Sequence, residues 1–367
     1  MAQLINLLSW LPGHSGFGSY VQRVVPGLPG LRLQLDAAGH GVLVDPEIWS
    51  PAPPPQAPRQ PMALLQRYGL VQHGLSLPSL LAQRDLAVEQ LEVIYSPFFE
   101  ALLGWPQVPQ LITCHDLTPL VLPNSRKAWL RYRLWQPRHL RCATRVLAIS
   151  RYVADQLLDF GVAADRIAVV PNGIEVVRER ISAPASEDLL VLARHDANKN
   201  LPALLQALAG VQRRLPDWRG FVRIVGRGGR QSLLLRRLWG QLPRPEQVHW
   251  IPSCAPQELV QHLRQSLALI SSSVEEGFDY PVLEAKAEGL PTLISEIPVH
   301  REFHEGSSLF FPPHDDGSVL ATHLQQLRRD QRAWQHLAEA GYHLAQQMSV
   351  AAQVAQIREL MVDVASP

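Results

Sequence analysis

Short apolar runs separated by longer amphipathic stretches fill the first half of the chain. The runs are residues 4–10, 93–96, 110–114, 145–149 and 167–170. Continuous apolar runs of this length are typical of strands that are buried on both faces of a sheet. Because helical patterns lie between them, the alternation predicts a parallel sheet with right-handed helical crossovers.

The same alternation restarts in the second half, after a stretch rich in Ser, Ala and Pro at residues 182–186. It predicts strands at residues 188–193, 221–225, 248–251, 268–272 and 292–295, and helices at 201–214, 230–242 and 256–265. No sequence repeat accompanies the restart. We therefore expect two α/β domains with Rossmann-like sheets and a boundary between residues 173 and 187.

Composition agrees with two globular domains and argues against one class of binding partner. The chain has 367 residues, enough for two domains of about 150–180 residues each. Hydrophobic residues make up 46% and charged residues 18%, which indicates a folded rather than a disordered chain. The formal net charge of +1 argues against a nucleic-acid partner.

Cysteines and hydropathy predict the compartment. Three scattered cysteines, Cys114, Cys142 and Cys254, have no metal-ligand spacing and are typical of reduced thiols. No apolar run is long enough to span a membrane, and no charged leader precedes the first apolar stretch. We expect a cytoplasmic protein, at most peripheral to the inner face of a membrane.

Two carboxylates eight positions apart, Glu276 and Glu284, mark the most informative segment. The strand predicted at residues 268–272 leads into a loop, and the loop opens a helix whose first position suits Pro281. Gly289 is well placed to end that helix, so we expect Glu284 in its first turn. Such strand-loop-helix junctions bind ligands in open α/β sheets, and a helix N-terminus attracts phosphate.

A pair of carboxylates beside an anion site needs a role other than phosphate binding, because like charges repel. An ionised Glu accepts hydrogen bonds from two neighbouring hydroxyl groups. The pair therefore suits a nucleotide-sugar, with one carboxylate on the ribose and one on the hexose. The alternative for Glu284 is a favourable interaction with the helix dipole alone.

This segment resembles the signature of the retaining family-four glycosyltransferases of the GT-B fold, a Glu followed by seven residues and a second Glu. Four more segments resemble the same family in the same order. They are a glycine-rich first loop at 13–20, a His-Asp segment at 111–123, the end of the first domain at 148–174 and a phosphate-clamp region at 190–201.

The resemblance implies an α/β protein of the GT-B fold, in which two Rossmann-like domains with parallel sheets face each other across a cleft. It implies an acceptor-side N-terminal domain over residues 1–175 and a nucleotide-sugar-binding domain over residues 176–345. A C-terminal helix within residues 346–367 is expected to cross back to the first domain, which periodicity alone does not predict.

The resemblance also assigns roles around the paired carboxylates. It places Glu276 on the hexose hydroxyls and Glu284 on the ribose, and the motif's spacing selects Glu276 over Glu275. The neighbours expected to bind the donor are Gly277, Phe278, Asp279 and Tyr280. The family often has glycine at position 279, so an Asp there adds bulk and charge beside the donor.

Two cations, Arg194 and Lys199, fall in the phosphate-clamp region. An arginine fork binds phosphate oxygens bidentately, and lysine supplies a mobile point charge. The alternative for Lys199 is an ordinary solvated loop lysine. Fixed cations and a helix N-terminus can stabilise a departing diphosphate without a metal. We expect no metal and no cofactor, because the nucleotide-sugar is a substrate.

Further site residues follow from the other matching segments. His115 and Asp116 follow a predicted strand, and the resemblance places His115 on the donor sugar, near the attacking hydroxyl. A structural role is the alternative for both. Gly16 and Gly18 could bring backbone N–H groups close to the diphosphate, or could form an ordinary tight turn. Gly226 is expected to shape the base pocket.

A basic stretch without acidic residues covers residues 126–151. It holds Trp129, Tyr132 and Trp135 among seven arginines and one lysine. Such a surface can lie on an anionic membrane or meet a lipid-phosphate acceptor. The alternative is a solvated helix face with its aromatic residues turned to the core.

These features predict an enzyme that moves a hexose from a nucleotide-diphosphate sugar to a saccharide or lipid-linked saccharide. The His-Asp-Leu-Thr-Pro sequence at residues 115–119 is similar to bacterial mannosyltransferases of surface polysaccharide synthesis, which favours GDP-mannose as the donor. The alternatives are a UDP-sugar-dependent glucosyl- or galactosyltransferase and a non-catalytic nucleotide-sugar-binding subunit.

Overall fold

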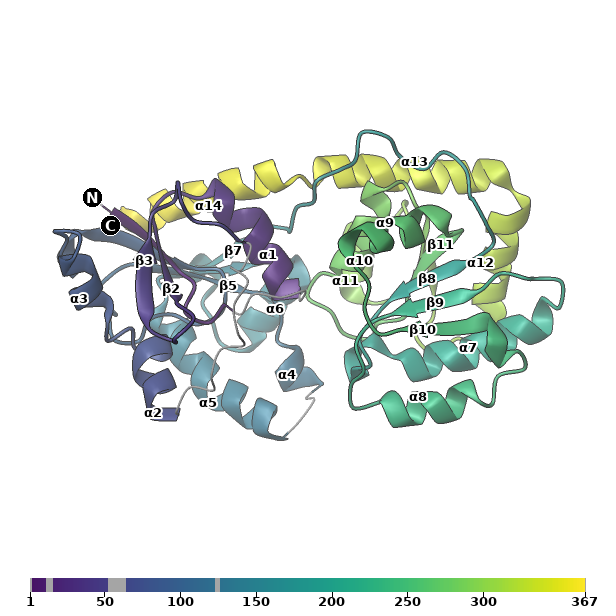
Figure 1. Cartoon of the computed structure of the whole chain (residues 1–367), viewed down its shortest axis with the longest axis horizontal. Coiled ribbons are helices and arrows are strands. Elements are labelled where there is room, and N and C mark those ends of the chain that lie inside the picture. Colours follow the sequence, from purple (N-terminus) through teal and green to yellow (C-terminus); the bar gives the residue numbers. More distant parts are fainter. Residues whose placement is uncertain (1, 11–15, 52–63, 123–125, 367) are drawn as a thin grey trace. The chain divides into compact units, whose positions relative to one another are not determined.

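Two compact units make up the chain (Figure 1). The computed structural model describes residues 2–10, 16–51, 64–122 and 126–366. Of these residues, those up to 120 and those at 126–173 and 350–366 belong to the first unit, and those at 121–122 and 174–349 belong to the second. Each unit is an α/β sandwich around its own sheet.

A seven-stranded sheet forms the centre of the first unit. Its strand order is β3 (Gly41–Val44), β2 (Leu31–Leu35), β1 (Ala2–Asn6), β4 (Leu91–Ser96), β5 (Gln110–Cys114), β6 (Arg145–Ala148) and β7 (Ile167–Val169). All neighbours pair in parallel except β2 and β3, which are antiparallel. Every residue of β5 is buried, as expected for a strand covered on both faces.

The antiparallel edge is a difference from the purely parallel sheet that the pattern predicts. In β2, apolar residues alternate with Arg32 and Gln34, so this strand has no continuous apolar run. A tight turn joins it to β3, with Asp36 donating its N–H to His40 O at 2.9 Å. The first strand is also shorter than predicted, because the chain turns where Trp10 N donates to Leu7 O.

Helices cover both faces of this sheet. They are α1 (Gly16–Val24), α2 (Leu64–Arg67), α3 (Leu77–Ala82), α4 (Thr118–Val121), α5 (Arg126–Cys142), α6 (Arg151–Asp159) and α14 (Val350–Ala365). The last of these packs against α1, β4 and β5. Its Gln353 accepts a hydrogen bond from Gly173 N at 2.8 Å and donates one to Asn172 Oδ1 at 3.1 Å. The C-terminal helix is thereby fixed to the first unit.

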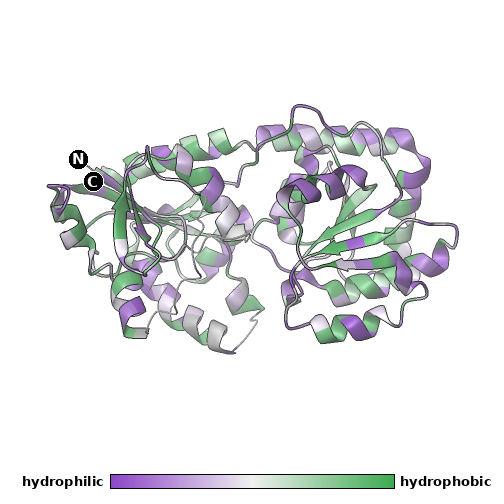
Figure 2. Cartoon of the chain, viewed as in Figure 1, coloured by the Kyte–Doolittle hydropathy of each residue, from purple (hydrophilic) through white to green (hydrophobic). Residues whose placement is uncertain are grey.

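A six-stranded, fully parallel sheet forms the centre of the second unit. Its order is β10 (Val248–Ile251), β9 (Val222–Val225), β8 (Leu189–Leu192), β11 (Ala268–Ser271), β12 (Thr292–Ser295) and β13 (Leu309–Phe311). The sequence pattern predicted five of these strands and missed β13, which has only three residues. The central strands are mostly hydrophobic along their length (Figure 2).

Helices lie on both faces of the second sheet as well (Figure 1). They are α7 (Leu201–Arg214), α8 (Ser232–Trp239), α9 (Pro256–Gln265), α10 (Tyr280–Ala287), α11 (Pro298–His304), α12 (Ser318–Arg329) and α13 (Gln331–Gln347). Six of the eight residues of α10 are buried, because this helix packs on β11, β12 and α13. The helix that carries Glu284 is therefore a rigid part of the core.

The predicted fold class, two Rossmann-like α/β units with parallel sheets, is confirmed. Strands at 110–114, 248–251 and 292–295 and helices at 201–214 and 256–265 have the predicted bounds. Across the described ranges, no helix combines the length and apolar character that a membrane crossing requires.

Candidate active site

Two neighbouring strands of the second sheet bring the predicted site residues together. β8 leads to Arg194 and then to a short 3₁₀ turn, η5 (Ala197–Lys199), while β11 leads to the loop before α10. Because β8 and β11 are parallel neighbours, their carboxyl ends lie at the same sheet edge. Ser272 Oγ donates to Lys199 O at 2.8 Å, and Val274 N donates to Asn198 O at 2.8 Å.

The centre of the site is an ion pair between Lys199 and Glu276. Lys199 Nζ lies 2.6 Å from Glu276 Oε1 and 3.5 Å from Asp279 Oδ1. Asn198 Nδ2 also donates to Glu276 Oε1, at 3.2 Å. The Lys199 side chain is only 19% exposed, Glu276 13% and Asp279 1%. These distances exclude the alternative that Lys199 is a solvated loop lysine.

Burial and charge shift the pKa of all three groups. Burial disfavours the charged form of Lys199, but Asp279 and Glu276 outweigh it and raise the lysine's pKa. Burial raises the pKa of Glu276, the charge of Asp279 adds to this, and Lys199 opposes it. Burial would also raise the pKa of Asp279, but Lys199, His300 and Ser271 together hold it well below its usual range. The site keeps a cation beside an ionised Asp279.

Helix α10 positions the second carboxylate. The helix begins at Tyr280, one residue before Pro281, and no acidic residue lies in its first turn. The prediction that Glu284 lies in the first turn is therefore wrong, since it is the fifth helical residue and lies in the second turn. Gly289 follows the end of the helix with a φ of +79°, and its N–H donates to Lys286 O at 2.9 Å.

The residues between the two carboxylates are packed rather than open. Gly277 is buried, and Phe278 is 3% exposed with its ring 4.9 Å from that of Phe303 and 5.3 Å from that of Tyr280. This aromatic packing fixes the loop that carries Glu276. It gives Phe278 and Tyr280 a structural role beside any contact with a ligand.

Arg194 lies in different surroundings from Lys199. Its Nε is 3.3 Å from Asp196 Oδ2, and its side chain is 65% exposed. An exposed arginine keeps its rotational freedom and can turn toward an anion from solvent. The two predicted phosphate contacts therefore combine one mobile cation and one buried cation.

Gly226 has a packing reason for being glycine. A Cβ at this position would lie 1.9 Å from Ala193 O, so no other residue fits without a backbone shift. Its N–H donates to Ile251 O at 2.9 Å. The predicted contribution to the base pocket stays a prediction.

The sequence reasoning did not single out His300, which reaches the site from α11. Its Nε2 is 3.1 Å from Asp279 Oδ2, and its Nδ1 is 2.7 Å from Ser295 O. Its ring is fully buried. The sequence gives no signal of this contact, because only the return of α11 after β12 brings His300 to Asp279.

In the first unit, His115 follows β5 and is buried. Its Nε2 lies 2.8 Å from Pro97 O, and its ring meets Tyr20 edge-on at 4.6 Å. A carbonyl oxygen only accepts, so Nε2 carries the proton. Burial lowers the pKa of His115 to about 4, although the bond to Pro97 opposes the shift. His115 is therefore a neutral imidazole near pH 7.

Asp116 and the first-loop glycines also have structural positions. Asp116 Oδ1 accepts a hydrogen bond from Thr118 N at 3.0 Å and so holds the start of α4. Gly16 and Gly18, which were predicted to lie in a loop, lie in the first turn of α1. Residues 13–15 of the predicted glycine-rich loop are outside the described residues.

Within residues 2–10, 16–51, 64–122 and 126–366, no group of three or more His, Cys, Asp or Glu side chains could hold a metal ion.

Two family models match successive parts of the chain. Residues 30–178 match "Glycosyltransferase Family 4", and residues 176–344 match "Glycosyl transferases group 1". Together they cover most of both units. The first match contains His115, and the second contains Lys199, Glu276 and Glu284.

Individual relatives are distant. The chain is 24% identical over 211 residues to the O-antigen chain mannosyltransferase RfbU of Salmonella typhimurium, covering 57% of this chain and 58% of the relative. It is 24% identical over 208 residues to the lipopolysaccharide 1,6-galactosyltransferase of the same organism, covering 51% and 56%. The chain thus spans just over half the length of these curated relatives.

A solved structure extends the likeness over the whole chain. The fold is similar to that of Anabaena Alr3699/HepE in complex with UDP-glucose, with a TM-score of 0.72 and 17% identity. The alignment covers 99% of this chain and all of that chain. At this level of identity the likeness concerns the fold.

Proposed function

Because this chain belongs to the family-four glycosyltransferases of the GT-B fold, we propose that it transfers a hexose from a nucleotide-diphosphate sugar to a saccharide or lipid-linked saccharide, with retention of anomeric configuration. The acceptor belongs to polysaccharide or lipopolysaccharide synthesis. Mannose from GDP-mannose is the favoured transfer.

One observation carries this proposal, the buried contact of Lys199 with Glu276 beside α10. A largely buried lysine paired with carboxylates adds little net stability, which favours a use of its charge in ligand binding. A diphosphate offers such a use, because negative charge grows on it as the sugar departs. Glu276 then becomes free to accept hydrogen bonds from sugar hydroxyls.

The predicted site residues are assigned to different parts of the donor. We assign Arg194 and Lys199 to the diphosphate, Glu284 to the ribose, and Glu276 with the backbone of Gly277 to Tyr280 to the hexose. His115 is assigned to the donor sugar. Its neutral ring suits hydroxyl groups better than phosphate, since it brings no positive charge.

The identity of the donor sugar separates the alternatives. Similarity to a mannosyltransferase supports mannose, while similarity to a galactosyltransferase and to a UDP-glucose-binding structure supports a UDP-sugar. A non-catalytic nucleotide-sugar-binding subunit would keep the binding cations without needing Glu276. The paired Lys199 and Glu276 favour the enzyme.

The test is a donor panel without added metal. Thermal unfolding is measured with GDP, UDP and ADP and with their hexose conjugates, and sugar transfer or donor hydrolysis is followed for each conjugate. A ligand at about 100 times its Kd adds about 2.7 kcal/mol of stability, which is a clear shift in Tm. We expect one nucleotide to stabilise selectively and Glu276→Ala to abolish transfer without loss of fold. No stabilisation by any nucleotide would contradict the proposal.

We also propose peripheral contact with an anionic membrane through α5. Trp129 is 36% exposed and Leu130 and Leu134 are each 50% exposed, whereas Tyr132 is buried. The Arg133 guanidinium lies 5.3 Å from the centre of the Trp129 ring. Exposed apolar residues interleaved with arginines favour a surface that binds lipid headgroups over a purely solvated face.

A further inference from the structure

Asp279 occupies a position that is unfavourable for its residue type in three ways. Its φ of +67° is in the left-handed region, which glycine adopts most readily, although Asp tolerates it better than most other residues. Its side chain is 1% exposed, and its carboxylate is ionised in the protein interior. Such a combination persists only where surrounding groups hold it.

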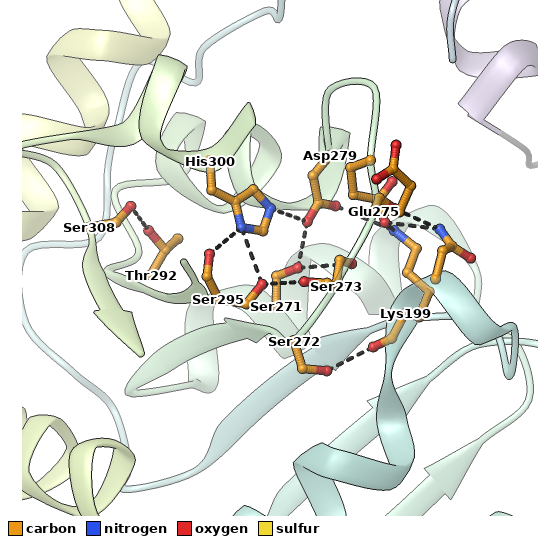
Figure 3. A network of polar contacts seen from close by, with 12 residues as sticks. Lys199, Ser271, Ser272, Ser273, Glu275, Asp279, Thr292, Ser295, His300 and Ser308 are labelled. Atoms are coloured by element: carbon orange, nitrogen blue, oxygen red, sulfur yellow. Dashed lines mark hydrogen bonds and ion pairs between the residues drawn. The ribbon is translucent and has the colours of Figure 1, made fainter. Parts of the chain in front are cut away.

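Three side chains hold the Asp279 carboxylate (Figure 3). Oδ2 accepts hydrogen bonds from Ser271 Oγ at 2.5 Å and from His300 Nε2 at 3.1 Å. Oδ1 faces Lys199 Nζ at 3.5 Å. Asp279 is thereby the link between His300, on the far side, and Lys199, which pairs with Glu276.

The contacts of His300 determine its protonation. Nδ1 lies 2.7 Å from Ser295 O, and a carbonyl oxygen can only accept. The Ser295 hydroxyl is already used as a donor to Ser273 O. Nε2 faces the carboxylate of Asp279, which also accepts. Both ring nitrogens are therefore placed to donate, an arrangement that favours the imidazolium form.

This protonation balances the charges in the buried cluster. Lys199 and His300 supply two cations, and Glu276 and Asp279 supply two anions. Without the charge on His300, one buried carboxylate would lack a partner, which is strongly unfavourable. Two further titratable groups flank the cluster, Lys286 of α10 and His304 of α11. Burial lowers the pKa of both side chains.

We propose that His300 is a positioning residue of this site: as an imidazolium it fixes Asp279, and Asp279 holds Lys199 Nζ in place for the donor diphosphate. The inference rests on the proposed function, because the diphosphate gives Lys199 its task. When the donor draws Glu276 toward its hydroxyl groups, Asp279 remains as the counter-charge that keeps Lys199 from moving.

Loss of the contact between His300 and Asp279 is expected to slow the chemical step. Charge on the diphosphate increases as the bond to the sugar breaks, so a displaced Lys199 costs more in the transition state than in the bound donor complex. Arg194 and the N-terminus of α10 still hold the donor in the ground state. A purely structural pair would instead change the Tm and leave kcat unchanged in the protein that remains folded.

The experiment is a double-mutant cycle with His300→Gln, Asp279→Asn and both together. The matched control is His304→Gln, because His304 lies on the same helix, is 1% exposed, and its ring nitrogens have no hydrogen-bond partner among the described residues. We measure kcat and the donor KM at saturating acceptor, and Tm. We expect each single variant to lose kcat by about tenfold or more, with KM within about threefold.

The double variant should lose no more kcat than the worse single variant, since the two residues act on Lys199 through one chain of contacts. His304→Gln should retain the wild-type kcat. The positioning role would be overturned if the kcat loss of the double variant were the product of the two single losses. It would also be overturned if kcat were unchanged in single variants that fold.

Asp279→Gly keeps the proposal testable if a buried substitution impairs folding. Glycine accepts the left-handed backbone, which offsets part of the cost of removing the carboxylate, so this variant should still fold and should lose kcat about tenfold or more. A kcat at the wild-type level would refute the proposal. Absence of turnover by the wild type with every donor in the panel would instead refute the proposed function.

Long-range ¹⁵N spectra of histidine side chains provide a readout that is independent of activity. His300 should give an imidazolium pattern near pH 7, assigned by its loss in His300→Gln. A neutral His300 in the wild type would contradict the argument even if transfer were normal.

Discussion

The end of β5 in the first unit and the ends of β8 and β11 in the second unit differ in the charge of the side chains that they bury. At the end of β5, His115 is buried as a neutral ring bonded to a backbone carbonyl. At the ends of β8 and β11, Lys199, Glu276 and Asp279 are buried as charged or charge-paired groups. One region keeps charge out of its interior, and the other concentrates it.

The difference reflects what each region can offer a ligand. Buried charges need partners, and breaking such a pair by removing one member is strongly destabilising. A diphosphate needs fixed positive charge, whereas a sugar hydroxyl is well served by neutral groups. The paired charges of the second unit therefore suit the phosphate end of a donor, and the neutral histidine of the first unit suits a hydroxyl.

The largest expected effect comes from removing the buried cation. Lys199→Met keeps most of the aliphatic part of the side chain and leaves Glu276 without its counter-charge. We expect transfer to fall on the order of 10²–10³-fold, as for the loss of a fixed charge at a developing anion. Steady-state kinetics with the donor identified in the panel measures this fall.

Arg194→Met is the matched comparison for Lys199→Met. Arg194 is exposed and paired only through its Nε to Asp196 among the ion pairs of the described residues, so its loss should cost about tenfold. A larger loss for Arg194→Met than for Lys199→Met would reverse the assignment of the principal phosphate contact.

Most of the fold and part of the site could be predicted from the sequence, for physical reasons that can be named. Continuous apolar runs gave the parallel strands, and the eight-residue spacing of Glu276 and Glu284 marked the junction before α10. The β2–β3 hairpin was not predicted, because polar residues interrupt β2 and β3 has only four residues. The charge of Lys199 could be placed from the motif, but its contact with Glu276 depends on the pairing of β8 with β11.

His300 shows why the rest of the site could not be predicted. It lies 21 positions after Asp279, on a short helix that follows the next strand. Neither periodicity nor spacing relates the two residues. Only the packing of α11 beside the loop before α10 brings a ring nitrogen to the carboxylate, and only the opposing Ser295 carbonyl indicates the proton on the other nitrogen.

A smaller effect is expected when acid charges the neutral histidines of the first unit. Burial lowers the pKa of His115 and of His139 to about 4. Unfolded histidine titrates near about 6.5, so between these values the unfolded chain binds protons that the folded chain does not. Stability therefore rises with pH and is lost as the pH falls from about 6.5 to about 4, by up to about 3 kcal/mol per histidine.

Urea unfolding of the wild type and of His139→Gln at pH 7 and pH 4.5 measures this loss. The variant should lose less stability on acidification than the wild type, because it lacks one of the two buried rings. His40→Gln is the control, since the His40 side chain is 73% exposed and should leave the pH dependence unchanged. Equal acid sensitivity of the wild type and His139→Gln would show that His139 is not buried as a neutral ring.

The smallest effect concerns the cations that the first unit keeps on its surface. On α5, Arg133 and Arg141 are exposed, and each arginine near an anionic membrane contributes about 1 kcal/mol. Removing both as Arg133→Gln/Arg141→Gln should weaken binding to phosphatidylglycerol vesicles by about 30-fold at low salt. Arg236→Gln/Arg237→Gln on α8 is the matched control, because that helix also combines exposed arginines with exposed leucines. Equal weakening by the α5 and α8 double substitutions would indicate general attraction to charge rather than docking through α5. If the wild type did not sediment with the vesicles at low salt, the membrane proposal would be refuted.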